Sequence, residues 1–151
     1  MAEDMHRQSV LNFLDAFYSG DIDKAMTYCD EELDSVTHAP VDLFPHLGQK
    51  HGRAWISEAI RTQQSYYSSR KCEVKFMAVE GDKVATIQLL SLRKRNDDRM
   101  VRLETAQFFT MRDGLIHIHR AFLDSFDFVQ QLLGQDLTHS FATDLREAMR
   151  S

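Results

Sequence analysis

The sequence lacks the features that mark several large classes of protein. No apolar run approaches the roughly 18 residues that a membrane span needs, and no basic segment followed by an apolar stretch opens the chain. The two cysteines, Cys29 and Cys72, form no C-x-x-C motif, so neither a zinc knuckle nor a disulfide framework is indicated. Motifs for nucleophilic or phosphate chemistry are also missing. We therefore expect a cytoplasmic protein with no membrane partner and no cofactor.

Positive charge is scarce as well. The chain has 18 lysines and arginines against 23 aspartates and glutamates, which gives a net charge of −5. Binding to nucleic acid or to an anionic membrane requires a basic surface that displaces counterions. The one basic run, Arg93 to Arg95, is followed at once by Asp97 and Asp98, and we interpret it as a solvated hairpin tip. We expect no nucleic-acid partner.

Glycine and proline are few, and hydrophobic residues are abundant. The chain contains 6 glycines and 2 prolines among 151 residues, and 43% of its residues are hydrophobic. This balance is typical of a globular protein and excludes fibrous or disordered chains. A chain of this length buries one core and is too short for two. The sequence predicts a single domain over residues 1–151, with a core over about 8–130 and a C-terminal amphipathic helix over about 137–150.

Helical spacing dominates the first third of the chain. Val10, Phe13, Leu14 and Phe17 recur at steps of three and four residues, and Gly20 follows where a helix would end. Asp21 is suited to cap the next helix, because its carboxylate can accept from the free amides of the first turn. The predicted elements here are helices over 10–17 and 22–29, a short strand over 33–38 and a third helix over 55–67.

The connection over residues 39–52 is predicted to be irregular. It holds both prolines of the chain and two of its glycines. A loop of this length in a compact domain is more often a functional cover than a plain connector.

From Cys72 onward the apolar positions alternate with a period of two. Gly81-Asp82, residues 96–98 and Asp113-Gly114 are turn signals between these segments. Helices first and strands later is the α+β pattern, in which a sheet folds over helices on one face. The sequence therefore predicts an antiparallel meander with strands over 72–80, 83–95, 99–112 and 115–124.

Three stretches of the sequence carry a resemblance to a known family. They are Phe13-Leu14-x-x-Phe17-x-x-Gly20-Asp21, the proline-containing loop into Gly52-Arg53, and Asp113-Gly114-Leu115-Ile116 leading into Arg120-Ala121-Phe122-Leu123-Asp124. Together they resemble the SnoaL-like, or nuclear transport factor two-like, superfamily, which includes ketosteroid isomerase, limonene-epoxide hydrolase and the polyketide cyclases. The resemblance implies an α+β cone-shaped roll, in which a strongly curved antiparallel sheet packs on the N-terminal helices and encloses one pocket.

The catalytic residues of these relatives are not matched in this chain. At the positions of the isomerase's tyrosine, aspartic acid and base, the resemblance places Phe13, Gln107 and the segment 37–39. At the positions of the hydrolase's arginine and two aspartates, the resemblance places Gln88, Leu90 and Ala121. The resemblance thus implies the enclosure of the family without its two best-understood sets of catalytic residues.

The last predicted strand is apolar on both faces. Strict alternation places His117, His119 and Ala121 on one face and their neighbours on the other. A strand that is apolar on both sides must be covered on both, and one layer of helices covers only one. We therefore predict a twofold sheet-to-sheet homodimer, with contacts through Phe108, Ile116, Ile118 and Phe122.

Imidazoles and amides dominate the polar residues expected at the pocket. His119 can act as a general base while Gln107 donates to an oxygen that gains charge, and His38 approaches from the loop edge. Alternatively, His119 and Gln107 hydrogen-bond to each other in a partly polar core. The residues expected to contact a ligand are Phe13, Phe17, Trp55, Gln88, Leu90, Phe109, His117 and Ala121.

The sequence is compatible with several functions. One is acid–base catalysis on a small, mostly apolar carbonyl or cyclic compound, of isomerase, cyclase or hydratase type. Another is a ligand-binding or protein-interaction module that has lost its catalysis. A third is a metal site built on His117 and His119, with His38, His46 or His51 as a further ligand. A β-bulge could also turn Glu104 inward and supply a carboxylate.

Overall fold

One curved sheet and the helices beneath it form the body of the computed structural model, which describes residues 2–150. Within these residues the chain forms five helices and a single six-stranded sheet. The elements are α1 (Ala2–Ser19), α2 (Ile22–Thr27), β1 (Cys29–His38), β2 (Gly48–His51), α3 (Ala54–Tyr66), β3 (Tyr67–Glu80), β4 (Lys83–Lys94), β5 (Met100–Arg112), β6 (Leu115–Leu123), α4 (Ser125–Leu133) and α5 (Thr138–Met149).

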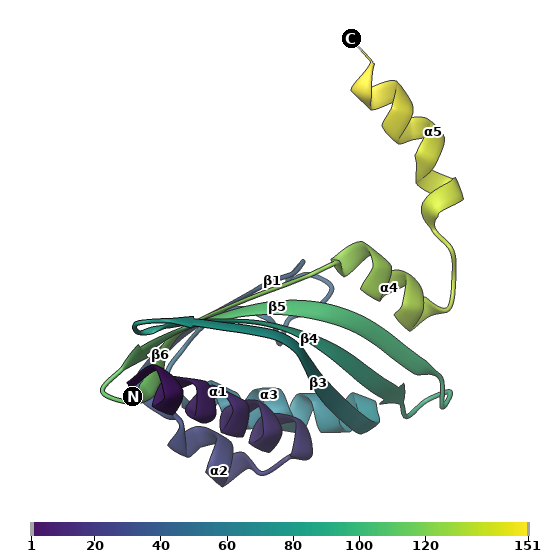
Figure 1. Cartoon of the computed structure of the whole chain (residues 1–151). Helices are drawn as coiled ribbons and strands as arrows, with labels where there is room; N and C mark the ends of the chain where they lie inside the picture. The colour runs from purple at the N-terminus through teal and green to yellow at the C-terminus, as the bar shows by residue number, and fades with distance from the viewer. Residues whose placement is uncertain (1, 151) are drawn as a thin grey trace.

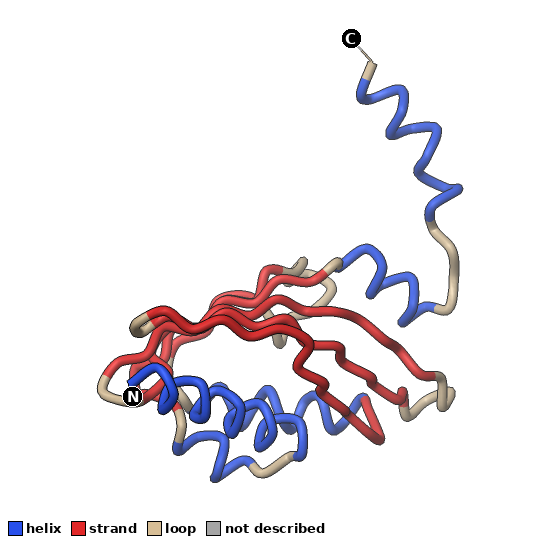
Figure 2. Tube along the Cα trace, viewed as in Figure 1, coloured by secondary structure: helices blue, strands red, loops and turns tan. Residues whose placement is uncertain are grey.

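The sheet curves over the first three helices. Figure 2 shows α1, α2 and α3 together on its concave side, while the convex side carries none of these helices. The apolar stripe of α1, which includes Val10 and Leu14, is buried against Ile56 and Ile60 of α3 and against Phe109 of the sheet. The predicted α+β fold with a curved sheet packed on N-terminal helices is confirmed.

The order of the strands makes the sheet mixed. The strands lie in the order β2-β1-β6-β5-β4-β3. Strands β3 to β6 form the predicted antiparallel meander, but β1 and β6 run parallel to each other. A parallel pair requires a long crossover, which the chain between β1 and β6 supplies. The sheet therefore departs from the wholly antiparallel expectation at this one pairing.

Local sequence signals set several element boundaries as predicted. Helix α1 ends before Gly20, whose φ of 87° is in the left-handed region that glycine tolerates. The Asp21 side chain caps α2 by accepting from the Lys24 amide at 3.2 Å. Helix α5 is also present, and none of its residues is buried. It projects away from the body of the molecule (Figure 1).

Several elements differ from the sequence-based expectation. Helix α1 begins at Ala2, α2 ends at Thr27, and β1 begins at Cys29, where the second helix was expected to end. Strand β3 begins at Tyr67 and not at Cys72, because the chain passes directly from α3 into the sheet. The connection 39–52 contains the short strand β2, which pairs with β1. Helix α4 was not predicted; the Asp124 side chain caps it, and Gly134 ends it with a φ of 68°. No helix of residues 2–150 combines the length and the apolarity that would let it cross a membrane.

A β-bulge in β6 corrects the predicted position of Ile116. On β5, Thr110 pairs with Ile118 and the next residue, Met111, pairs with Ile116, so His117 is an extra residue without a partner. The bulge interrupts strict alternation, and the Ile116 side chain turns into the core with 1% exposure. Ile116 therefore cannot take part in the predicted contact on the outer face of the sheet.

Candidate functional site

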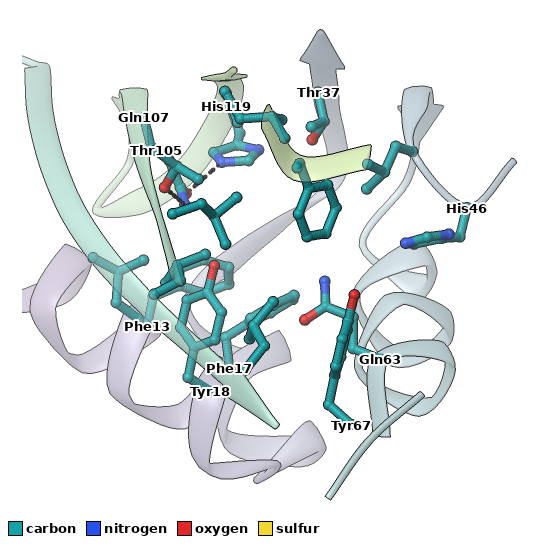
Figure 3. A pocket seen from close by; sticks show the side chains of 18 of the residues that line it. Phe13, Phe17, Tyr18, Thr37, His46, Gln63, Tyr67, Thr105, Gln107 and His119 are labelled. Carbon is teal, nitrogen blue, oxygen red and sulfur yellow. Dashed lines mark hydrogen bonds between the residues drawn. The ribbon is translucent and has the colours of Figure 1, made fainter. Parts of the chain in front are cut away.

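A cavity of about 100 Å³ lies between the concave face of the sheet and helices α1 and α3. Its walls are mostly apolar, and the helical spacing of α1 accounts for two of them, Phe13 and Phe17 (Figure 3). Leu90 and Leu103 come from the inward positions of β4 and β5. Phe128 of α4 contributes to the lining from the other end of the chain. The cone-shaped enclosure thus contains a real, largely apolar space.

His119 lies on the inner wall in a chain of hydrogen bonds. Its Nδ1 is 2.8 Å from the Ser35 hydroxyl, and its Nε2 is 2.8 Å from Oε1 of Gln107. An amide oxygen only accepts, so Nε2 carries the proton and donates, and Nδ1 accepts from Ser35. The sequence-based alternative that His119 and Gln107 hydrogen-bond to each other is therefore confirmed.

Burial keeps the His119 imidazole neutral. The side chain is 8% exposed, and loss of water, followed by the positive charge of Arg120, lowers the pKa of His119 to about 4. An imidazole with this pKa is a weak base at neutral pH. Because both of its nitrogens are already hydrogen-bonded, His119 must release Ser35 from Nδ1 before it can accept a proton.

Two tyrosine phenols supply hydroxyl groups at the cavity. Tyr18 hydrogen-bonds the side chain of Gln107, and burial is the main cause that raises the pKa of Tyr18. Burial also raises the pKa of Tyr67 to about 12. Both phenols are therefore protonated at neutral pH. The amide of Gln107 additionally donates to the Thr105 hydroxyl at 3.4 Å.

The Gln63 amide is oriented by an arginine outside the cavity. Arg70 donates from Nη1 to Oε1 of Gln63 at 2.8 Å and from Nη2 to the Phe17 carbonyl at 2.7 Å. Because its oxygen is held by Arg70, the amide nitrogen of Gln63 faces the cavity (Figure 3). Gln63 is thus a hydrogen-bond donor in a fixed direction.

Most of the predicted site residues lie at the cavity or directly behind it. The lining contains Phe13, Phe17, Trp55, Leu90, Gln107, His119 and Ala121. Phe109 lies behind this lining, with its ring centroid 6.2 Å from that of Phe13 and 5.1 Å from that of His119.

Three predicted site residues lie elsewhere. Alternation along β1 turns Thr37 inward and His38 outward, where the His38 ring stacks on Phe122 at 4.3 Å. The bulge keeps His117 out of the lining, and its Nδ1 is 4.0 Å from a carboxylate oxygen of Asp30. Gln88 is fully buried in the inner face of β4 but is not among the described residues that line the cavity.

Neither the metal alternative nor the inward Glu104 matches this geometry. Within residues 2–150 no three histidine, cysteine or acidic side chains are grouped as metal ligands. The bulge that separates His117 from the cavity also separates it from His119. Glu104 is exposed, because β5 pairs with β4 without a bulge along this stretch.

The cavity carries no formal charge at neutral pH. Among the described residues that line it there is no aspartate, glutamate, lysine or arginine. Its titratable groups are the two phenols, His119 and His46, and burial followed by the charge of Lys50 lowers the pKa of His46. The sequence did not identify Tyr18, Gln63 or Tyr67 as cavity residues, because the direction of each side chain depends on neighbours from other elements.

Known proteins share this fold and part of this sequence. Residues 10–119 match the family model of the SnoaL-like domain. A candidate isomerase from Rhodopseudomonas palustris is 25% identical, with a TM-score of 0.74 over 84% of this chain and 97% of that one. An M. tuberculosis LEH-like epoxide hydrolase is 17% identical, with a TM-score of 0.73 over 94% of this chain and 99% of that one.

A third solved structure is similar to the same extent. A candidate SnoaL-like polyketide cyclase from Jannaschia sp. CCS1 is 17% identical, with a TM-score of 0.73 over 85% of this chain and 92% of that one. No curated protein sequence matches the chain. The family model covers more than half of the chain and the solved structures share its fold, so the protein belongs to the SnoaL-like family.

Proposed function

We propose that the protein binds a small, mostly apolar molecule in the cone cavity, and that the buried part of this ligand is neutral and carries an acceptor oxygen. The observation that supports this most is the uncharged lining with donors directed into it. An ionised group in such a dry space would lose its hydration without gaining a partner charge. The Gln63 amide nitrogen and the protonated phenols of Tyr18 and Tyr67 suit a carbonyl, ether or hydroxyl oxygen.

The size of the cavity limits the part of the ligand that enters it. A protein cavity of about 150 Å³ holds benzene. The present cavity measures about 100 Å³, so it suits a small ketone or alcohol, or one end of a longer molecule.

A binding experiment with matched variants tests this proposal. We expect butanone to bind the wild-type protein in an NMR titration and to shift the signals of residues around Gln63. Gln63→Leu removes the oriented donor and is expected to weaken binding by up to about tenfold, the value of one hydrogen bond. Gln64→Leu makes the same change at an exposed position of the same helix and should leave binding unchanged. Equal affinities for all three proteins would contradict the proposal.

Acid–base catalysis of isomerase, cyclase or hydratase type is a second candidate function. The observation in its favour is that a neutral imidazole lines the cavity and is connected to Ser35 and Gln107. In this scheme His119 releases Ser35, accepts a proton at Nδ1 from the ligand or from water, and Gln107 stabilises the oxygen that gains charge. Loss of turnover in His119→Asn with unchanged ligand affinity would support it, whereas binding without conversion favours a module that only binds.

The outer face of the sheet remains our proposal for a homodimer contact. Phe108 and Phe122 are 46% and 44% exposed, and their rings meet edge to face at 5.9 Å. Ile118 lies on the same face of β6, with Arg120 between it and Phe122, so three of the four predicted contact residues support the proposal. The two cysteines are free thiols, which suits the proposed cytoplasmic location.

A further inference from the structure

A second hollow adjoins the cavity. It has a volume of about 310 Å³ and lies between the connection 39–52, the start of β3, the β4–β5 hairpin and α4. We call it the outer hollow; it is lined by Leu43, Phe44, Tyr66, Lys94, Arg95 and Leu132, and it shares His46 and Tyr67 with the cavity. Two side chains therefore form a common wall between the two spaces.

Within residues 2–150, the His46 side chain is held at this common wall by ring contacts alone. Its backbone carbonyl accepts from the Trp55 indole at 3.5 Å, which holds the loop in place. Its imidazole contacts the rings of Phe44 and Tyr66, with centroids 6.4 and 6.0 Å away. Among the described residues the imidazole has no hydrogen-bond partner. Rotation of the ring thus breaks no hydrogen bond, and it is the movement that a ligand occupying both spaces would require.

The cavity and the outer hollow together have the size of an ordinary ligand site. Sites for small molecules usually measure about 300 to 1,000 Å³, which the cavity alone does not reach. With the outer hollow added, the space falls within this range. A ligand that fills both must be elongated.

The outer hollow offers a positive charge, unlike the cavity. Arg95 donates from Nε to the Gln64 carbonyl at 2.7 Å, and no carboxylate pairs with it among the residues that the structure describes. Lys94 is already occupied, because its ammonium donates to Asp97 and to the Leu132 carbonyl. No aspartate or glutamate is among the described residues that line the hollow. The guanidinium of Arg95 is thus the group available to an anion.

We infer that the ligand is an elongated amphiphile whose neutral, oxygen-bearing end enters the cavity, whose chain passes His46, and whose terminal carboxylate pairs with Arg95. This inference rests on the proposed function, because it assumes that the cavity binds the neutral end. It assigns the remainder of the ligand to the outer hollow. The class of ligand is then a medium-chain acid with a ketone or hydroxyl group far from its carboxylate.

Three probes separate the two proposals in the intact protein. The first is butanone, which is small enough for the cavity alone. The second is 9-oxodecanoate, which carries a ketone at one end and a carboxylate at the other. The third is the methyl ester of 9-oxodecanoate, which has the same length without the charge. We expect calorimetry to show that 9-oxodecanoate binds most tightly of the three. We expect 9-oxodecanoate and its methyl ester, but not butanone, to shift the NMR signals of Leu43 and Tyr66.

Substitution of Arg95 tests the charge pairing. Arg95→Gln should weaken the binding of 9-oxodecanoate by up to about fivefold, the effect of a partly exposed ion pair, and leave the ester and butanone unchanged. Arg61→Gln, at an exposed position of α3, should change none of the three affinities. If acid and ester bind wild-type protein equally while butanone binds, the inference is wrong and the proposed function stands. If none of the three probes binds, both the inference and the proposed function are wrong.

Discussion

Burial determines how the polar side chains of the inner wall behave. Ser35, Gln107 and His119 are 0%, 6% and 8% exposed, and each has a hydrogen-bond partner inside the protein. An imidazole in water titrates near neutral pH, whereas that of His119 remains neutral far below it. The buried imidazole of this wall therefore makes the folded protein sensitive to acid.

We expect the free energy of unfolding to fall as the pH is lowered from about 6.5 to about 4. The pKa of His119 is about 4 in the folded protein and 6.5 when unperturbed, so the unfolded state binds the proton first in this window. The loss is about 3 kcal/mol at most, and His46 adds to it because its pKa is lowered in the same direction. Urea denaturation at several pH values measures the slope.

Two variants test how much each histidine contributes to this dependence of the free energy of unfolding on pH. His119→Gln is expected to remove most of it, and His46→Gln a smaller share. The depressed carboxylate pKa values of Asp30, Asp97 and Asp136 act mainly below the 3.8 of an ordinary aspartate, so they overlap only with the acid end of the histidine window. A slope that survives in His119→Gln would show that this imidazole is not buried and neutral in solution.

The Gln88 amide is a second residue whose burial has a cost. It is 0% exposed, and neither its oxygen nor its nitrogen has a hydrogen-bond partner among residues 2–150. We expect Gln88→Leu to raise the free energy of unfolding by about 1 kcal/mol or more, because it removes an unpaired buried amide at similar volume. Chemical denaturation measures the difference.

Gln107→Leu is the matched control for Gln88→Leu. It removes an amide that is paired with His119 and Thr105, so it should lower stability instead. A Gln88→Leu protein that is less stable than wild type would indicate that the Gln88 amide is hydrogen-bonded in solution.

Helix α5 contributes little to the stability of the body. None of its residues is buried, and Phe141 meets Phe126 of α4 at a ring distance of 6.2 Å. We expect deletion of residues 137–151 to change the free energy of unfolding by less than about 1 kcal/mol in dilute solution. Deletion from Ser125 also removes Phe128, which stacks on Phe44 at 5.2 Å, and should destabilise the protein clearly. If the two deletions lowered the free energy of unfolding equally, the expectation that α4 stabilises the body and α5 does not would be wrong.

Elements bounded by local signals could be predicted from the sequence, and those bounded by distant pairing could not. The end of α1 at Gly20, the cap at Asp21 and the three hairpin turns depend on residues next to them in the chain. The bulge at His117 depends on how β6 pairs with β5 and β1 at once, which alternation along one strand does not contain. His117 and Ile116 were misplaced for this reason.

The same distinction applies to the candidate site. Phe13 and Phe17 were predicted because they lie on the apolar stripe of α1, and His119 and Ala121 because strand alternation holds beyond the bulge. Gln63 was missed because its direction is set by Arg70, which comes from another element. To identify residues that are oriented by tertiary contacts requires a structure, or a search of the sequence for polar residues on otherwise apolar helix faces.

The whole molecule leaves the convex face of its sheet open to a second copy. We expect Phe108→Ser and Phe122→Ser each to weaken self-association by about tenfold or more, because aromatic residues at the centre of a contact contribute most of its affinity. Phe126→Ser changes an aromatic residue of similar exposure, 45%, that lies on α4 and contacts Phe141 of α5; it is the matched control and should have no effect. Sedimentation velocity over a range of concentrations measures the association. A wild-type protein that remains monomeric throughout would contradict the proposed homodimer.

The parallel contact of β1 with β6 determines when the cavity wall can form. Ser35 and His119, which meet across this contact, are 84 residues apart in the chain. During synthesis, β1 leaves the ribosome long before β6 exists, so the inward side chains of β1 lack their packing partners until β6 has been made. Closing so long a loop is entropically costly and slow, and the nascent chain exposes its apolar lining until the final strand arrives. Chaperones that recognise exposed apolar segments would therefore bind this protein through the same residues that later line the cavity.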